Sequence, residues 1–224
     1  MKIEYESLDG LDYLIRYPND YQKGGKYPVI LFLHGAGSRG NNMEQIRENP
    51  FLTITDRYTR FPFLTVAPQC SSDTWFDLFE SLKDLVSEIV KRTDTDEKRI
   101  YLMGASMGGY AAWQLAMSMP DLFAAIVPIC GGGMYWNAAR LVNVPVWAFH
   151  GKRDPVVFVE ESEKMVTAVN RCGGNARLTV YPEKEHDSWT DTYQNWEVFE
   201  WMLSKENTNT HKLADDHHDS RRYG

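Results

Sequence analysis

Apolar runs of strand length alternate along this chain with stretches whose apolar residues recur at helical spacing. The runs predict strands at residues 11–17, 28–33, 63–67, 99–105, 124–130, 144–149 and 176–181. The helical stretches predict helices at residues 41–48, 77–91, 107–119, 160–171 and 189–203. Because strands and helices alternate throughout, we expect an α/β fold with a mostly parallel sheet and helices on both faces.

The spacing between these elements leaves little room for a second domain. A turn is expected at 19–26, and Asn49-Pro50 is expected to stop the helix before it. No internal repeat, long linker or insertion of the size of a lid domain is visible. We therefore expect a single domain over residues 1–204 and a polar C-terminal tail over residues 205–224 that is mobile or loosely docked.

The pattern Gly104-x-Ser106-x-Gly108 stands between the strand at 99–105 and the helix at 107–119. A strand that turns sharply into a helix at this pattern exposes the serine hydroxyl above the sheet. The flanking glycines avoid clashes across the turn, and the helix directs its first amides toward the serine. A glycine-rich loop with an inert serine is the alternative, but the strand and helix on either side favour a nucleophile at Ser106.

A serine nucleophile needs a base within hydrogen-bond reach and a group that orients the base. In sheets of this kind the acid and then the histidine follow the serine along the chain, each in a loop after a strand. Asp154 follows the strand at 144–149, and His186 follows the strand at 176–181. We therefore predict the catalytic triad Ser106, Asp154 and His186.

Other titratable residues near these loops are weaker candidates. His34 and His150 end apolar strands, where a histidine is more often satisfied by local backbone than used for proton transfer. Glu185 and Asp187 adjoin His186, but adjacent residues rarely face one another across a triad. Asp154 remains the preferred acid.

Acyl transfer also needs donors already in place for the oxyanion. One is expected from the backbone amide of Met107, the residue after the nucleophile. The other is expected from the loop after the strand at 28–33, where Gly35 and Gly37 let the chain approach closely, and we select the Ala36 amide. A simple turn is the alternative at this loop.

Composition narrows the compartment and the partners. The formal net charge is −7, with 43% hydrophobic and 25% charged residues. This balance is typical of a soluble globular protein and disfavours nucleic-acid and membrane partners. The three widely spaced cysteines predict free thiols in a reducing compartment. No signal-peptide pattern opens the sequence, so a cytoplasmic location is expected.

Histidines in the tail raise the question of a metal. His-rich tracts can bind metal ions. Here His211, His217 and His218 are not accompanied by cysteines or a spaced set of carboxylates, so no metal site is predicted.

Four segments together carry a resemblance to a known family: residues 33–37, 104–109, 149–154 and 186–189. They resemble the α/β-hydrolase fold, and more narrowly the small single-domain carboxylesterases related to phospholipase/carboxylesterase, feruloyl-esterase-like and prolyl-oligopeptidase-like catalytic domains. The resemblance extends over about residues 10–204. It implies ester hydrolysis through an acyl-enzyme, with neither a metal nor an organic cofactor.

Substrate contacts are less well defined by the sequence. Trp75, Trp136 and Trp189 fall near loops expected to surround the serine, where they would favour aromatic or sugar-linked acyl esters; plain packing is the alternative. Arg39 and the asparagines at 41–42 are candidates for contact with a polar substrate group, although such a segment is often only a loop.

The sequence thus predicts a serine carboxylesterase for small-molecule esters with short-chain, aryl or sugar-linked groups, and it leaves a homodimer open. A serine peptidase or aminoacyl hydrolase on the same triad is the nearest alternative. A non-catalytic partner-binding module is another, although it should lack a triad residue. A lipase would need a lid. Dienelactone-type hydrolysis usually uses cysteine at the position of Ser106.

Overall fold

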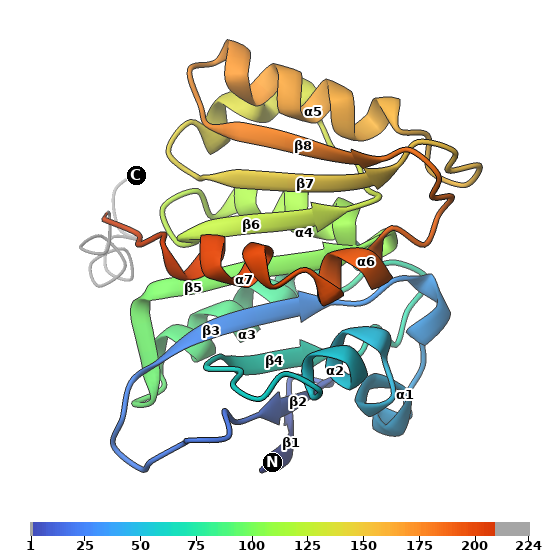
Figure 1. Ribbon diagram of the computed structural model, residues 1–224. Coiled ribbons are helices and arrows are strands. Elements are labelled where there is room, and N and C mark those ends of the chain that lie inside the picture. Colours follow the sequence, from blue (N-terminus) through green and yellow to red (C-terminus); the bar gives the residue numbers. More distant parts are fainter. Residues whose placement is uncertain (1, 209–224) are drawn as a thin grey trace, which may run out of the picture.

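The computed structural model describes residues 2–208 and builds them around one eight-stranded sheet (Figure 1). The strands are β1 (Ile3–Leu8), β2 (Leu11–Arg16), β3 (Tyr27–Leu33), β4 (Leu64–Pro68), β5 (Thr95–Ala105), β6 (Ala125–Ile129), β7 (Val146–Gly151) and β8 (Ala176–Tyr181). Their order is β1-β2-β4-β3-β5-β6-β7-β8. β1 and β2 pair antiparallel, as do β2 and β4, and the remaining pairs are parallel. The predicted mostly parallel sheet is confirmed.

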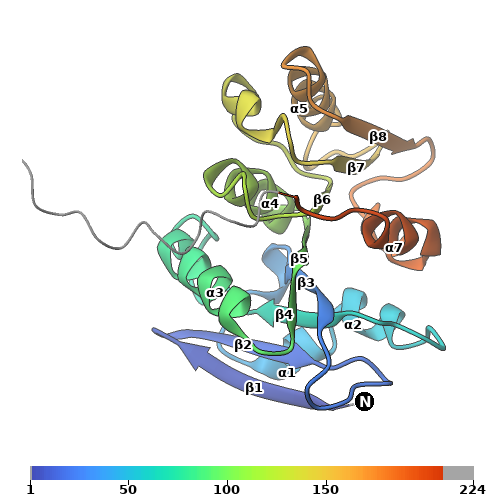
Figure 2. The ribbon, with the colours of Figure 1, turned by 90° about the vertical axis from the view of Figure 1, so that its left-hand side faces the viewer.

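Helices cover both faces of this sheet, as the edge-on view in Figure 2 shows. One face carries α3 (Phe79–Lys91), α4 (Met107–Ser118) and α5 (Glu160–Arg171). The other carries α1 (Met43–Arg47), α2 (Pro50–Thr55), α6 (Trp189–Gln194) and α7 (Trp196–Leu203). Two 3₁₀ helices, η1 (Ala36–Ser38) and η2 (Tyr135–Leu141), lie in loops. Among the described helices, none is long and apolar enough to cross a membrane.

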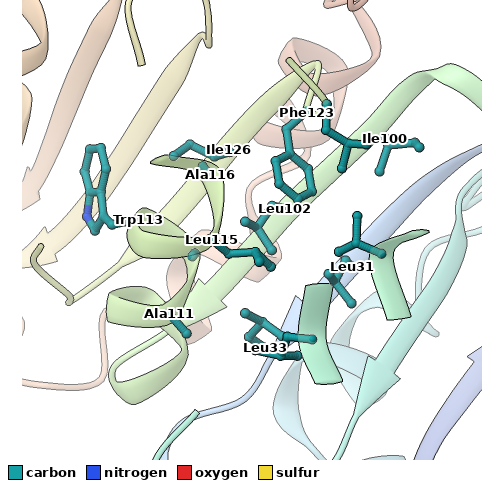
Figure 3. Close-up of a cluster of buried hydrophobic side chains, with 14 of the residues drawn as sticks. Leu31, Leu33, Ile100, Leu102, Ala111, Trp113, Leu115, Ala116, Phe123 and Ile126 are labelled. Atoms are coloured by element: carbon teal, nitrogen blue, oxygen red, sulfur yellow. The ribbon is translucent and has the colours of Figure 1, made fainter. Parts of the chain in front are cut away.

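The central strand β3 is apolar at successive positions because helices cover both of its faces. Val29, Leu31 and Leu33 belong to the core under α3 and α4, whereas Ile30 and Phe32 belong to the core under α2, α6 and α7. Side chains alternate between the two faces of a strand, so a strand covered on both sides must be apolar throughout. Figure 3 shows side chains of α4 meeting those of β3 and β5 in the first of these cores.

The antiparallel edge of the sheet was not predicted in full, because the first expected strand began at residue 11. β1 forms a hairpin with β2, with a register that runs from Ile3 opposite Arg16 to Leu8 opposite Leu11. The turn is Asp9-Gly10, whose φ angles are 49° and 83°. Asp-Gly is a preferred pair for a two-residue hairpin turn in which both residues have positive φ. This dipeptide was the local signal for the hairpin.

Two asparagines account for the differences in helix boundaries. Asn49-Pro50 follows the end of α1 and also begins α2. The Asn49 side chain caps the first turn of α2 by accepting a hydrogen bond from the Phe51 amide. Proline is tolerated in this first turn because an N–H there would have no partner within the helix. The helix predicted over 189–203 is instead two helices, α6 and α7. They meet at Asn195, whose side chain accepts a hydrogen bond from the Glu197 amide at 3.1 Å.

The first residues of the predicted tail dock on the sheet. The backbone amide of Asn207 donates to the carbonyl of Lys98 in β5 at 2.8 Å. The Tyr101 hydroxyl donates to the carbonyl of Lys205 at 2.9 Å. Residues 209–224, which include the histidines at 211, 217 and 218, lie outside the described residues.

Candidate active site

Ser106 lies at the sharp corner between β5 and α4. Its backbone has φ 56° and ψ −117°, a conformation that residues other than glycine rarely adopt. The corner is fixed from both sides, because the Ser106 amide donates to the Ile129 carbonyl at 2.9 Å and its carbonyl accepts from the Tyr110 amide at 3.1 Å. The serine is therefore held at the edge of the sheet where the parallel strands end.

The glycines of the motif are needed because backbone segments approach one another closely. A Cβ atom on Gly108 would lie 1.9 Å from the carbonyl oxygen of Leu33. A Cβ atom on Gly104 would lie 2.1 Å from the carbonyl oxygen of Gly108. No side chain fits at such distances. The close packing places Ser106 directly beside the loop that follows β3.

Ser106, His186 and Asp154 meet here from three separate loops. His186 Nε2 lies 2.9 Å from Ser106 Oγ, and His186 Nδ1 lies 2.8 Å from Asp154 Oδ2. An ionised carboxylate only accepts hydrogen bonds, so Nδ1 carries the proton and Nε2 is left to accept from the serine hydroxyl. The chemistry that this arrangement permits is removal of the hydroxyl proton by an oriented imidazole.

The carboxylate of Asp154 is buried and surrounded by donors. Oδ1 accepts from the amides of Val156 and Val157, both at 2.9 Å. Oδ2 accepts from His186 and lies 3.3 Å from Nε2 of His150. Burial by itself would raise the pKa of Asp154, but the hydrogen bonds from His186 and the two amides outweigh it and hold that pKa below its usual range. The acid therefore stays charged.

The loop after β3 starts from a buried histidine. His34 Nδ1 donates to the Gly35 carbonyl at 2.7 Å, and His34 Nε2 accepts from the Cys70 amide at 2.9 Å. Burial lowers the pKa of His34 to about 4, so the ring is neutral near pH 7. As expected from its position at a strand end, His34 is satisfied by local backbone. It fixes the start of the loop in which Ala36 begins η1.

Trp75 and Arg39 support this loop and do not line the pocket beside Ser106. Trp75 is fully buried, and its Nε1 donates to the His34 carbonyl at 2.9 Å. Arg39 donates from Nε to the Ala36 carbonyl at 3.1 Å and from Nη1 to the Asp73 carbonyl at 2.8 Å. Trp75 is thus buried away from the position at which we expected it to contact substrate, whereas the exposed Arg39 supports the loop from outside, and its contact with substrate stays a prediction.

The pocket beside Ser106 has a volume of about 350 Å³. Phe32 and Tyr193 are its most deeply buried aromatic residues, whereas Val156 is 66% exposed at the mouth. Trp189 also lines the pocket, with its ring perpendicular to that of His186 at a centroid distance of 5.2 Å. The pocket thus has apolar walls close to the hydroxyl of Ser106.

Of the three tryptophans expected near the serine, the structure brings only Trp189 to the pocket. Trp136 lies on η2, is 72% exposed and does not line it. Phe32, Val156 and Tyr193 do line it and were missed. Each of these residues is close in the sequence to a predicted site residue or to the end of a predicted strand. The sequence alone did not show that their side chains face Ser106, because that depends on tertiary packing.

One further group of potential ligands lies at the triad. One ligand atom each of Cys130, Asp154 and His186 lies within 4.8 Å of the others. Asp154 and His186 are already hydrogen-bonded to each other, and burial raises the pKa of the Cys130 thiol to about 12, which keeps it protonated. This donor set fits a hydrogen-bonded triad better than a metal site.

Comparisons with known proteins place the chain among hydrolases. The bifunctional acetylxylan esterase/xylanase XynS20E of Neocallimastix patriciarum is 26% identical over an alignment of 175 positions that covers 73% of this chain and 25% of that protein. Dipeptidyl-peptidase 5 of Porphyromonas gingivalis is 22% identical over a gapped alignment of 229 positions that covers 81% of this chain and 33% of that protein. The chain thus spans a third or less of the length of these two relatives.

A solved structure of a thermostable esterase superposes with a TM-score of 0.77 at 31% identity, covering 92% of this chain and 63% of that one. The model of the dienelactone hydrolase family matches residues 20–197, which is more than half of the chain. Serine stands at position 106, where dienelactone-type hydrolysis usually uses cysteine. By fold and by sequence, the chain belongs to the dienelactone hydrolase family within the α/β-hydrolase superfamily.

Proposed function

We propose that this chain is a serine carboxylesterase. The observation that carries the proposal is the hydrogen-bonded series from Ser106 Oγ through His186 to Asp154 Oδ2, with spacings of 2.9 and 2.8 Å. Ser106 attacks the ester carbonyl while His186 Nε2 takes its proton, and the charged Asp154 stabilises the imidazolium. His186 then gives the proton to the leaving alcohol, which leaves an acyl group on Ser106.

The tetrahedral oxyanion needs amide donors during both halves of this reaction. We assign the amides of Ala36, the first residue of η1, and of Met107, the first residue of α4. Water, deprotonated by His186, then attacks the acyl-enzyme, and the second tetrahedral intermediate collapses to release the acid and restore Ser106. Every proton in the cycle is exchanged through the one imidazole.

The composition of the pocket favours esters over aminoacyl peptides. Similarity to dipeptidyl-peptidase 5 makes a peptidase the second candidate. An enzyme that removes amino acids from a free N-terminus needs an anionic group to bind the ammonium. Among the described residues that line the pocket, none is Asp or Glu. An uncharged ester fits these walls better than a cationic peptide terminus.

The test is hydrolysis of 4-nitrophenyl butyrate by the wild type, Ser106→Ala and Ser38→Ala. Ser38 lines the same pocket but is hydrogen-bonded to Asn49, so its substitution is the matched control. Loss on the order of 10³-fold or more in kcat/KM is expected for Ser106→Ala alone. Equal activity in the wild type and Ser106→Ala would rule the mechanism out. Faster turnover of aminoacyl 4-nitroanilides than of the ester would favour the peptidase.

A further inference from the structure

Tyr193 lines the pocket and is almost fully buried there. Its ring packs edge-to-face against Phe32 at 5.9 Å and against Phe51 at 5.2 Å. Its backbone carbonyl accepts a hydrogen bond from the Tyr58 hydroxyl at 3.0 Å. The side chain belongs to α6, the helix that follows His186 in the chain. The position of its hydroxyl is therefore fixed relative to the triad.

The hydroxyl of Tyr193 differs from the other unpartnered polar groups of the core. Four side-chain polar atoms among residues 2–208 are sealed from solvent without a hydrogen-bond partner: Arg16 Nε, Gln69 Oε1, Trp113 Nε1 and Ser188 Oγ. Tyr193 is 1% exposed, and its hydroxyl also has no hydrogen-bond partner among the described residues. Unlike the four sealed atoms, however, this hydroxyl oxygen keeps some contact with solvent. Its small accessible surface therefore faces the pocket that the residue lines.

The charge of the surroundings decides what this hydroxyl can bind. Burial raises the pKa of Tyr193 well above its ordinary value, and the nearby Cys130 and Asp187 act in the same direction, so the phenol stays neutral and can donate. Among the described residues that line the pocket, none is Lys or Arg. An anionic ligand group would therefore have no cationic side chain to pair with there, whereas a neutral acceptor oxygen would satisfy the Tyr193 hydroxyl.

We propose that the Tyr193 hydroxyl determines specificity by donating a hydrogen bond to a neutral acceptor oxygen of the substrate. The substrate class is then esters whose pocket-bound half carries an ether, methoxy or hydroxyl oxygen within an otherwise apolar group. This inference rests on the proposed esterase function and adds to it. A wholly alkyl group of the same shape leaves the donor unsatisfied and binds less well, as a site built for a hydrogen bond discriminates against an analogue that lacks it.

The experiment compares substrates that differ only by an oxygen in place of a methylene. On the acyl side the pair is 4-nitrophenyl 3-methoxypropanoate and 4-nitrophenyl pentanoate, with methoxyacetate and butyrate as a second pair that moves the oxygen. On the alcohol side it is 2-methoxyethyl butyrate and butyl butyrate. The wild type, Tyr193→Phe and Tyr101→Phe are each assayed for kcat/KM. Tyr101→Phe removes a tyrosine hydroxyl that donates to the Lys205 carbonyl and does not line the pocket.

On either the acyl side or the alcohol side, we expect the wild type to have a higher kcat/KM for the oxygen-containing ester than for its alkyl counterpart. Tyr193→Phe should lower this preference, the ratio of the two kcat/KM values, about 3- to 10-fold. Tyr101→Phe should leave the preference unchanged. An oxygen-to-alkyl ratio that is the same in the wild type and Tyr193→Phe for every pair would overturn the proposal. If Tyr193→Phe does not fold, a wild-type ratio near that of spontaneous hydrolysis for every pair overturns it instead. Failure of the wild type to hydrolyse any ester would overturn the esterase proposal as well.

Discussion

Nε2 of His150 lies 3.3 Å from Oδ2 of Asp154, the same carboxylate oxygen that accepts the hydrogen bond from His186. His150 is fully buried at the end of β7, and its Nε2 also donates to the Val157 carbonyl at 2.8 Å. One imidazole thus contacts both the acid and the backbone that shapes the acid loop. His150 is satisfied locally, as its sequence position suggested, and it also positions Asp154.

Replacing this imidazole should weaken catalysis without changing substrate choice. We expect His150→Leu to lower kcat by about 10- to 100-fold while KM changes little, because the variant loses the Nε2 hydrogen bond to the Val157 carbonyl and with it a support of the loop that holds Asp154. Steady-state kinetics with one ester checks this. Ser162→Ala is the control, since the Ser162 hydroxyl contacts Nδ1 of His150 on the other side of the ring. An unchanged kcat in His150→Leu would show that the contact is only structural.

Stability should decrease as the pH falls from about 6.5 to about 4. Burial lowers the pKa of His34 to about 4 from 6.5 and also lowers that of His150. Below 6.5 the unfolded chain binds a proton that the folded chain excludes, so this stabilisation is complete above 6.5 and is lost as the pH approaches 4. The loss from His34 is on the order of 3 kcal/mol.

Urea unfolding at a series of pH values measures this dependence in the wild type and in His34→Gln. The glutamine variant should show a shallower decrease because it has no imidazole to protonate. A variant curve that runs parallel to that of the wild type over the whole range would show that His34 is not the group responsible.

The corner at Ser106 should not tolerate a methyl group at its glycines. In Gly108→Ala the added carbon would lie 1.9 Å from the Leu33 carbonyl, so we expect destabilisation of about 3 kcal/mol or more, or no folded protein. Gly37→Ala is the matched control, because a carbon there meets nothing within 4 Å. Thermal unfolding followed by circular dichroism compares the two. Equal melting temperatures would contradict the close approach of α4 to β3.

The two tryptophans Trp75 and Trp189 should respond differently to substitution. Trp75→Phe leaves the buried carbonyl of His34 without its donor, so stability should fall by about 1–3 kcal/mol with little change in substrate preference. Trp189→Ala opens a wall of the pocket and should alter the relative kcat/KM for short and long acyl esters. Melting temperatures and a series of 4-nitrophenyl esters distinguish these effects. A change in acyl preference in Trp75→Phe would place that residue at the pocket after all.

The sequence predicted those parts of the molecule that depend on local pattern. Apolar runs located the parallel strands, and the loops after three of them carry Ser106, Asp154 and His186, which the structure brings into contact. What it could not predict depends on which side of an element faces inward. Trp75 turns into the core and Trp136 into solvent, whereas Tyr193 reaches the pocket from a helix.

The interlocked glycines limit where specificity can vary in this fold. Gly108 lies against the Leu33 carbonyl and Gly109 against that of Ile129, so the position of Ser106 is fixed by main-chain contacts that no single side-chain replacement can adjust. The exposed Val156 at the mouth is under no such restriction. Directed evolution toward a new ester should therefore accumulate changes at the rim of the opening, leaving the turn itself untouched.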